Sequence, residues 1–183
     1  MQMKKYAGLS LLIGILALML CTSVIAQDFP APLSNAATKL AGNQQVPVFL
    51  PTIIPSIVAR YGIKDVAVES AGSGYTVALY YSRHDSDATF AGMVAGSSAV
   101  FSSLPGTRKA RLANGTMALF RPVSCGGSCA PANLWWQVDG FEYQLQLKLA
   151  SGLDEGRQLR ALREMANSMI RVRYPDHVSR RAH

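Results

Sequence analysis

Residues 134–149 read LWWQVDGFEYQLQLKL, and their alternation decides the fold. In the second half of this stretch, apolar side chains take every second position and charged or amide side chains fill the positions between them. A period of two is typical of a strand with one buried and one wet face. Asp139-Gly140 is a two-residue turn sequence, and Leu134, Trp136 and Val138 alternate before it. The stretch therefore predicts an antiparallel hairpin.

Three earlier stretches of the sequence also have patterns that bear on secondary structure. Residues 65–70 and 75–81 alternate on either side of the turn sequence AGSG, which predicts a second hairpin. Asn114-Gly115 stands between two strand-like runs in residues 108–122 and predicts a third hairpin, with a type I′ turn in which both residues take positive φ. Residues 88–101 are rich in small side chains and fit either a loose helix or a glycine-interrupted strand.

The period changes after residue 150. Apolar side chains recur at steps of three and four from Leu159 to Ile170, which predicts one amphipathic helix over residues 153–172. Ser151 is the expected N-cap, with Asp154 near the positive end of the helix dipole. Hairpins followed by one helix predict an α+β domain, in which an antiparallel β-sheet built of hairpins carries a C-terminal amphipathic helix on one face.

The N-terminus has the pattern of a secretory signal peptide. Two lysines precede an uncharged apolar run over residues 7–21, and residues 24–26 offer small or compact side chains for cleavage after Ala26. The apolar run is short for a membrane span of about 20 residues. Two other interpretations stay open: an uncleaved anchor, and a lipoprotein that uses Cys21, although the bulky Leu20 precedes it.

We divide the rest of the chain into three parts. Residues 27–45 are polar and alanine-rich, so we expect a flexible leader with a short helix near residues 35–40. Residues 46–173 form a single α+β domain that begins with a proline-bracketed edge strand or extended lead-in over residues 46–51. Residues 174–183 are a basic, mobile tail. Once the signal peptide is cleaved we expect no membrane span, and a periplasmic or secreted bacterial protein.

Composition excludes several classes of protein. The chain has 183 residues, of which 49% are hydrophobic and 16% charged, unlike a disordered protein. Its formal net charge of +7 suits a partner with negative charge, but many soluble proteins carry a similar charge. The basic residues are spread along the chain without interleaved aromatic residues or a known motif, so we expect no nucleic-acid partner.

Cys125 and Cys129 are the most specific local feature. They enclose Gly-Gly-Ser, and in an exported protein two cysteines this close should form a disulfide. In the chain-entropy model, closing a loop of roughly five residues stabilises a protein by about 2 kcal/mol. The alternative is a redox pair that exchanges with client thiols, but the spacing is one residue longer than Cys-x-x-Cys. We favour the structural disulfide.

Patterns for catalysis or metal binding are weak. Of the three histidines only His84 lies well inside the predicted domain, in the sequence RHDSD at residues 83–87. This sequence fits a solvated turn better than a metal or acid–base loop, because no second cluster at ligand spacing accompanies it. No Gly-x-Ser-x-Gly elbow follows a strand. We therefore assign no catalytic residue, metal site or cofactor, and regard an enzyme as the less favoured interpretation.

Four side chains are candidates for a binding surface. Trp135 falls on the polar side of its strand, where an exposed indole could stack on a ligand or fill a partner's pocket. The competing interpretation, which we favour, is that residues 46–61 cover it. Tyr80 poses the same question on its own strand. Arg157 and Arg160 lie on the predicted polar face of the helix.

Residues 112–170 resemble an uncharacterised type of exported bacterial domain of unknown function. The shared features are an Asn-Gly hairpin, a Cys-Gly-Gly-x-Cys-x-Pro segment, a tryptophan followed by a glycine turn and a tyrosine, and a closing helix that ends near Ala-Asn-Ser; here they lie at residues 114–115, 125–131, 136–143 and 166–168. This half is also similar to extracytoplasmic domains of some anti-sigma factors, although we find neither their zinc-binding half nor their internal membrane span in this sequence. The resemblance implies an extracytoplasmic α+β fold and assigns no catalytic residue.

These patterns favour an exported, non-catalytic domain that binds a small ligand or an envelope protein. The expected working surface is the wet face of the sheet, the strand edge or the basic face of the helix. Two alternatives remain. One is an enzyme, either a hydrolase that uses His84 or a thiol–disulfide exchanger, and the other is a structural envelope protein that assembles through its edge strand.

Overall fold

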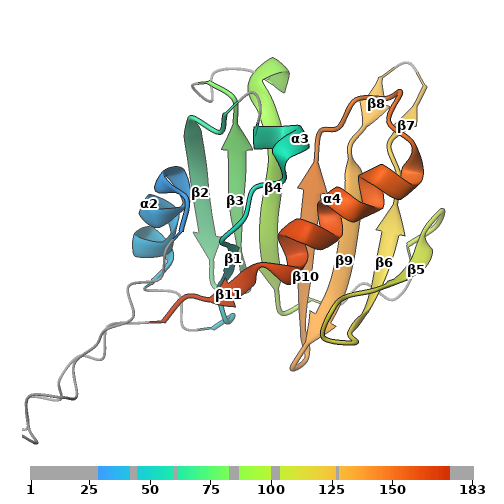
Figure 1. The fold of residues 1–183 in the computed structure, drawn as a ribbon. Helices are drawn as coiled ribbons and strands as arrows, with labels where there is room; N and C mark the ends of the chain where they lie inside the picture. Colours follow the sequence, from blue (N-terminus) through green and yellow to red (C-terminus); the bar gives the residue numbers. More distant parts are fainter. Residues whose placement is uncertain are drawn as a thin grey trace, which may run out of the picture. The chain divides into compact units, whose positions relative to one another are not determined.

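The computed structural model describes residues 29–41, 45–59, 62–82, 87–99, 104–126 and 128–173 (Figure 1). They belong to one compact unit that spans Asp28–Tyr174. The predicted signal peptide over residues 1–26 and the basic tail over residues 174–183 lie outside the described residues. Within the described ranges, no helix is long and apolar enough to cross a membrane.

Seven strands in the described chain form one antiparallel sheet in the order β2-β3-β4-β10-β9-β6-β5 (Figure 1). The strands are β2 (Asp65–Ala71), β3 (Gly74–Tyr80), β4 (Phe90–Ser97), β5 (Arg108–Arg111), β6 (Met117–Arg121), β9 (Ala132–Val138) and β10 (Phe141–Leu147). Strands β2, β3 and β4 form one half, β5, β6, β9 and β10 form the other, and β4 pairs with β10 where the halves meet. The predicted α+β class is confirmed, as are the three predicted hairpins.

The remaining elements are short, apart from two helices. Strand β1 (Phe49–Pro51) pairs with β11 (Met169–Arg171), and β7 (Ser124–Cys125) pairs with β8 (Cys129–Ala130). The helices are α2 (Ala31–Leu40), α3 (Ser56–Ala59) and α4 (Glu155–Asn167), with a 3₁₀ turn at Asp87–Thr89. Pairing of β1 with β11 confirms the predicted edge strand within residues 46–51.

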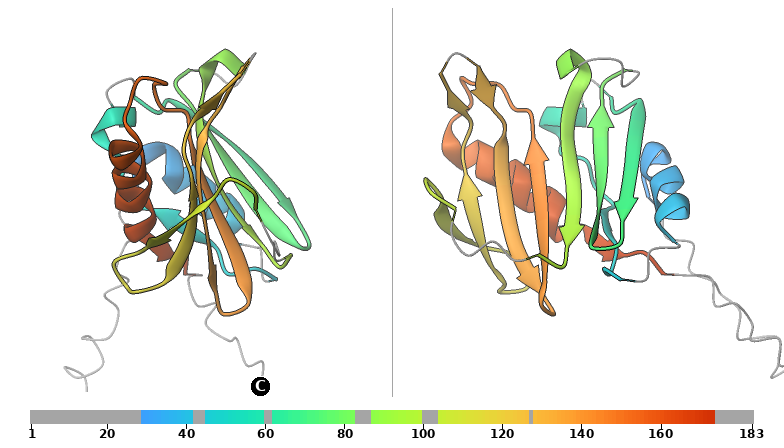
Figure 2. Two further views of the ribbon diagram at one scale, coloured as in Figure 1. Left: turned by 90° about the vertical axis from the view of Figure 1, so that its right-hand side faces the viewer. Right: turned by 180° about the vertical axis from the view of Figure 1, so that it is seen from behind.

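Helix α4 packs on one face of the seven-stranded sheet, which we call the inner face (Figure 2). Its buried side chains include Ala161, Leu162 and Met165, and they join one core cluster with Leu134 and Leu145 of the sheet. Apolar side chains at every second strand position therefore meet an apolar helix stripe, as the two periods predicted.

Helix α4 is shorter than the predicted helix over residues 153–172. Its N-cap is Asp154 instead of Ser151, and the Asp154 carboxylate accepts a hydrogen bond from the Arg157 backbone N–H at 2.9 Å. At the other end, Ser168 Oγ donates to the Met165 carbonyl at 2.8 Å and accepts from the Ile53 backbone N–H at 3.1 Å. The chain leaves the helix there because β11 pairs with β1.

Residues 31–40 form a helix, so the short helix predicted near residues 35–40 is confirmed but begins earlier, and the flexible leader predicted before it is wrong for residues 31–34. Leu33 and Leu40 of α2 are buried in the core, and α2 lies beside β2 (Figure 1). Pro30 and Pro32 stand at the cap and in the first turn, where proline costs no helical hydrogen bond. They begin the helix, and the folded unit starts before residue 46.

Residues 88–101 were ambiguous in sequence, and their described part is mostly strand β4. A Cβ built on Gly96 would overlap Cε1 of Tyr75 and lie 3.1 Å from Cε1 of Tyr143. Rings from both neighbouring strands thus occupy the space above Gly96. The strand pattern of β4 is weak in sequence because the large side chains that cover its inner face come from the neighbouring strands.

The same two tyrosines tie the β1 segment to the inner face. Tyr75 Oη accepts from the Phe49 backbone N–H at 3.0 Å and donates to the Phe49 carbonyl at 3.0 Å. Tyr143 Oη donates to the Pro47 carbonyl at 3.1 Å. Burial raises the pKa of Tyr143 to about 12 and also raises the pKa of Tyr75, because a phenolate loses its hydration there. Both hydroxyls therefore stay protonated and able to donate.

The turns at Asp139-Gly140 and Asn114-Gly115, two of the three predicted hairpin turns, differ in geometry. Asp139 and Gly140 have φ of 52° and 82°, as a type I′ turn requires. At Asn114-Gly115 only the glycine has positive φ, and its N–H donates to the Leu112 carbonyl at 3.0 Å. The predicted type I′ turn is wrong there: the loop is a type I turn followed by a left-handed glycine, which needs one more residue.

Candidate functional site

The candidate site is a pocket of about 280 Å³ on the outer face of the sheet, opposite α4. Its wall includes Leu104, Lys109, Met117, Leu119, Trp135 and Glu142. Glu142 and Trp135 alternate along their strands with the core residues Tyr143 and Trp136, which places them on the outer side. Strands β5, β6, β9 and β10 thus form the floor of the pocket.

One row of paired residues runs across this floor. Lys109 on β5 pairs in register with Leu119 on β6, Leu119 pairs with Trp135 on β9, and Trp135 pairs with Gln144 on β10. Directly opposite residues lie about 4.5–5.5 Å apart at their Cβ atoms, so their side chains contact one another. The row offers an aliphatic and an aromatic surface between an amine at one end and an amide at the other.

Trp135 is buried, with 5% of its surface exposed. The Arg121 guanidinium lies 5.0 Å from the centre of its ring, within the range of a cation–π contact. An exposed indole is therefore the wrong prediction. The favoured alternative, cover by residues 46–61, also fails for the described part of that segment, because Pro47 and Phe49 bond to tyrosines of the inner face.

Buried polar side chains surround Trp135 on the outer face. Asn133 is fully buried; its Nδ2 donates to the Pro131 carbonyl at 2.8 Å and its Oδ1 accepts from Gln144 Nε2 at 2.7 Å. Glu142 is only 5% exposed. The outer face was predicted to be wet, and in this half Asn133, Trp135 and Glu142 are instead buried, whereas Lys109 and Gln137 are exposed. Neither amide lines the pocket, but their hydrogen bond fixes the side chains next to Trp135.

The pocket has an uneven charge distribution. Lys109 is exposed and makes no ion pair within the described residues, and Arg121 lies over the indole. Glu142 brings a carboxylate into the wall. Met117, which lines the pocket, is 47% exposed and belongs to the few exposed large apolar side chains among the described residues. An apolar wall with a few convergent polar groups is typical of small-molecule sites.

The four predicted binding residues do not form one surface. Tyr80, on β3, contacts the ring of Phe90 at 6.1 Å and is separated from β9 by β4 and β10. Arg157 and Arg160 are exposed on α4, on the other side of the sheet from Trp135. Arg157 also forms an ion pair with Asp154, with 3.1 Å between Nε and Oδ2. Only Trp135 of the four lines the pocket.

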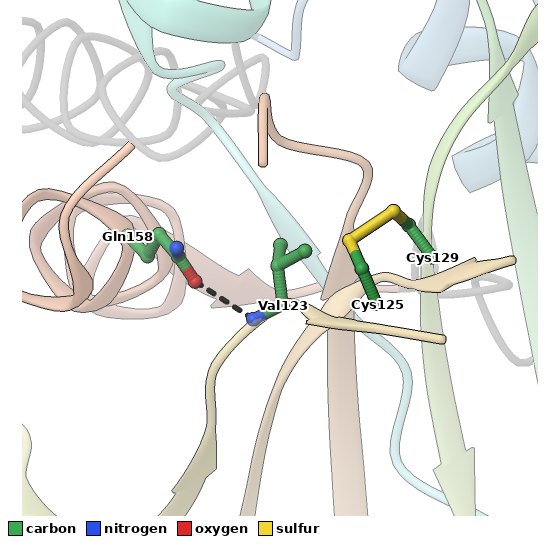
Figure 3. Close-up of a disulfide and its surroundings, with 4 residues drawn as sticks. All are labelled: Val123, Cys125, Cys129 and Gln158. Carbon is green, nitrogen blue, oxygen red and sulfur yellow. Dashed lines mark hydrogen bonds between the residues drawn. A yellow bond between two sulfur atoms is a disulfide. The ribbon is translucent and has the colours of Figure 1, made fainter. Parts of the chain in front are cut away.

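The predicted disulfide between Cys125 and Cys129 is confirmed (Figure 3). It closes the β7–β8 tip, where both cysteines are exposed. Below the tip, the buried Gln158 of α4 accepts from the Val123 backbone N–H at 2.8 Å (Figure 3). It also donates to the Leu153 carbonyl at 2.6 Å. Sequence reasoning missed Gln158; the signal was one polar residue four positions before the buried Leu162.

The histidine loop and the metal-binding interpretation concern other parts of the chain. Residues 83–86, with His84, lie outside the described residues. In the described part of the chain, no three His, Cys, Asp or Glu side chains gather as metal ligands would. No protein-family model, curated protein or solved structure matches this chain, so the resemblance to extracytoplasmic domains stays a prediction and function must be argued from the pocket.

Proposed function

We propose that this protein is an exported, non-catalytic binding domain of the bacterial envelope and that the pocket at Trp135 holds a small ligand. The observation that carries the proposal is the pocket itself: about 280 Å³, with a wall in which Leu119 and Trp135 supply aliphatic and aromatic surface beside Lys109 and Glu142. Its volume is at the lower end of the range for ligand sites, which favours a small molecule over a long acyl chain.

The pocket chemistry favours a ligand with an apolar or aromatic body and a negative group. Leu119 and Trp135 offer the apolar contact, and Lys109 stands at the end of the same row. Arg121 does not line the pocket, but it places a second cation against the Trp135 ring. An exposed amine beside an apolar wall attracts an anion without first having to break an ion pair within the described residues.

Two features support export. Residues 1–26 carry the signal-peptide pattern, and Cys125 and Cys129 form a disulfide, which is rare in a reducing cytosol. Intact native mass spectrometry of the protein from the envelope fraction of its own host would report cleavage, oxidation and any retained ligand together. A chain that begins at Gln27 and carries a reproducible extra mass is the expected result.

The pocket is tested with a probe of the expected chemistry, anilinonaphthalene sulfonate, titrated by calorimetry. We expect one site in the wild type and at least about tenfold weaker binding by Leu119→Trp, which fills the pocket. Leu159→Trp, a matched change at a half-buried leucine of α4, should bind as the wild type does. Near-UV circular dichroism verifies that each variant is folded.

Two outcomes would contradict the proposal. One is a folded Leu119→Trp variant that binds the probe as tightly as the wild type. The other is a wild-type protein that neither binds the probe nor carries an extra mass from the envelope.

Thiol–disulfide exchange is the second candidate, favoured by the exposure of both cysteines. The pair lies in a two-stranded tip and not at a helix N-terminus, which gives no structural reason for a low thiol pKa. A pair that stays oxidised in a glutathione buffer at neutral pH excludes this activity.

A further inference from the structure

The two edges of the seven-stranded sheet end differently. Helix α2 lies beside the edge strand β2 (Figure 1). On the other edge, β5 pairs with β6 and with no other strand in the described chain (Figure 1). An unpaired edge presents a row of backbone N–H and C=O groups that can pair with another extended segment.

The charges along β5 are divided between the two faces of the sheet. The Arg108 guanidinium bonds to the Glu155 carboxylate at the start of α4, on the inner side. Lys109 and Arg111 alternate with the buried Ala110 and so share the outer side. Both are exposed, and neither has an ion pair in the described part of the chain. One face of this edge thus carries two unneutralised cations, two residues apart.

The two cations on β5 determine which kind of strand can pair with this edge. If β5 paired with β5 of a second copy in antiparallel fashion, lysine and arginine side chains would face one another across the new pair, which is destabilising. A strand with carboxylates at alternate positions would instead face Lys109 and Arg111. The residue between the two carboxylates would lie on the side where Ala110 is buried, and an apolar side chain suits that position.

We propose that the β5 edge binds an extended acidic segment of a partner protein as an eighth strand. Its sequence alternates acidic and apolar residues. Backbone pairing with β5 supplies affinity, and the two carboxylates on Lys109 and Arg111 set the register. This surface is distinct from the pocket of the proposed function except for Lys109, which borders both.

The test uses three peptides of one composition and the folded, ¹⁵N-labelled protein. The first alternates Glu and Val; the second groups the same residues in two blocks; the third alternates them but carries N-methyl groups that remove the pairing donors. We expect the alternating peptide to bind at least about tenfold more tightly than either control, and to slow hydrogen exchange at the β5 amides that point away from β6.

Two variants locate the surface. Arg111→Glu should abolish binding of the alternating peptide, whereas Arg160→Glu, the same charge change on α4, should not. Arg111 does not line the pocket, so Arg111→Glu should bind anilinonaphthalene sulfonate as the wild type does. Loss of peptide binding and loss of probe binding are therefore separable failures.

Three outcomes would overturn the proposal. Equal binding of the alternating and block peptides means general attraction to anions. Sedimentation that shows a dimer dispersed by Arg111→Glu means that a second copy occupies the edge. No binding of any peptide at millimolar concentration means that the short, charged strand only protects the edge from aggregation.

Discussion

Trp135 and Trp136 are sequence neighbours with nearly equal exposure, 5% and 7%, yet they are buried by different means. Trp136 stacks on Tyr143 with 6.0 Å between ring centres and belongs to the continuous core of the inner face. Trp135 lies outside that core cluster, under Arg121 on the outer face, although both tryptophans border the pocket. Equal burial therefore does not mean an equal role in stability: the inner face holds the fold together, and the outer face shapes a site.

Alanine substitutions at the two tryptophans should give the largest change in stability and test this difference directly. Trp136→Ala should lower the free energy of unfolding by about 4 kcal/mol, because it leaves a cavity inside packed apolar side chains. Trp135→Ala should cost about half as much, since its surroundings already open to a pocket that water can enter. Urea denaturation of both variants measures the two costs. Equal costs would show that the outer face is as much a part of the core as the inner face.

Gly96 tests how tightly the inner face is closed. Gly96→Val should cost about 3 kcal/mol, because the new side chain meets the rings of Tyr75 and Tyr143 and forces the sheet or both tyrosines to shift. The control is Gly152→Val, at an exposed glycine with open space around it, which should change stability by about 0.5 kcal/mol or less. If Gly96→Val costs as little stability as its control, the inner face can accommodate the added side chain despite the close tyrosine rings.

Local pattern predicted the hairpins because period two along a strand needs no knowledge of distant residues. Helix α2 was predicted only in part, as a short helix near residues 35–40, because its stripe consists of Leu33, Leu40 and small alanines, and only burial against the sheet shows that they belong to the core. The end of α4 was misplaced for a similar reason: residues 169–171 fit a helix stripe, but β1 recruits them into a strand.

The candidate site was only partly predictable. Alternation placed Trp135 on the outer face, which the structure confirms, but not its burial or its contact with Arg121 of a neighbouring strand. A cation–π contact between residues on separate strands leaves no mark in the spacing of either strand. Lys109 and Leu119 were likewise unremarkable until the strand order placed them in one row with Trp135.

The hydroxyl of Tyr143 provides the smallest and most selective test of the inner face. Tyr143→Phe removes one hydrogen bond to the Pro47 carbonyl and should cost about 1 kcal/mol at neutral pH. The folded-state pKa of about 12 exceeds the ordinary value of 10, so above pH 10 the unfolded chain releases this proton while the folded chain retains it. Stability of the wild type should therefore fall as pH rises from 10 to 12.

Tyr143→Phe lacks this ionisation, so its stability should fall less steeply over the same interval, and the deficit relative to wild type should shrink or reverse. Thermal unfolding at pH 7, 10 and 11 measures the two slopes. Parallel slopes would mean that Tyr143 ionises as readily in the folded state as in the unfolded state. The β1 segment would then be held by its pairing with β11 and by the Tyr75 hydrogen bonds, and the Tyr143 hydroxyl would contribute little to the stability of the inner face.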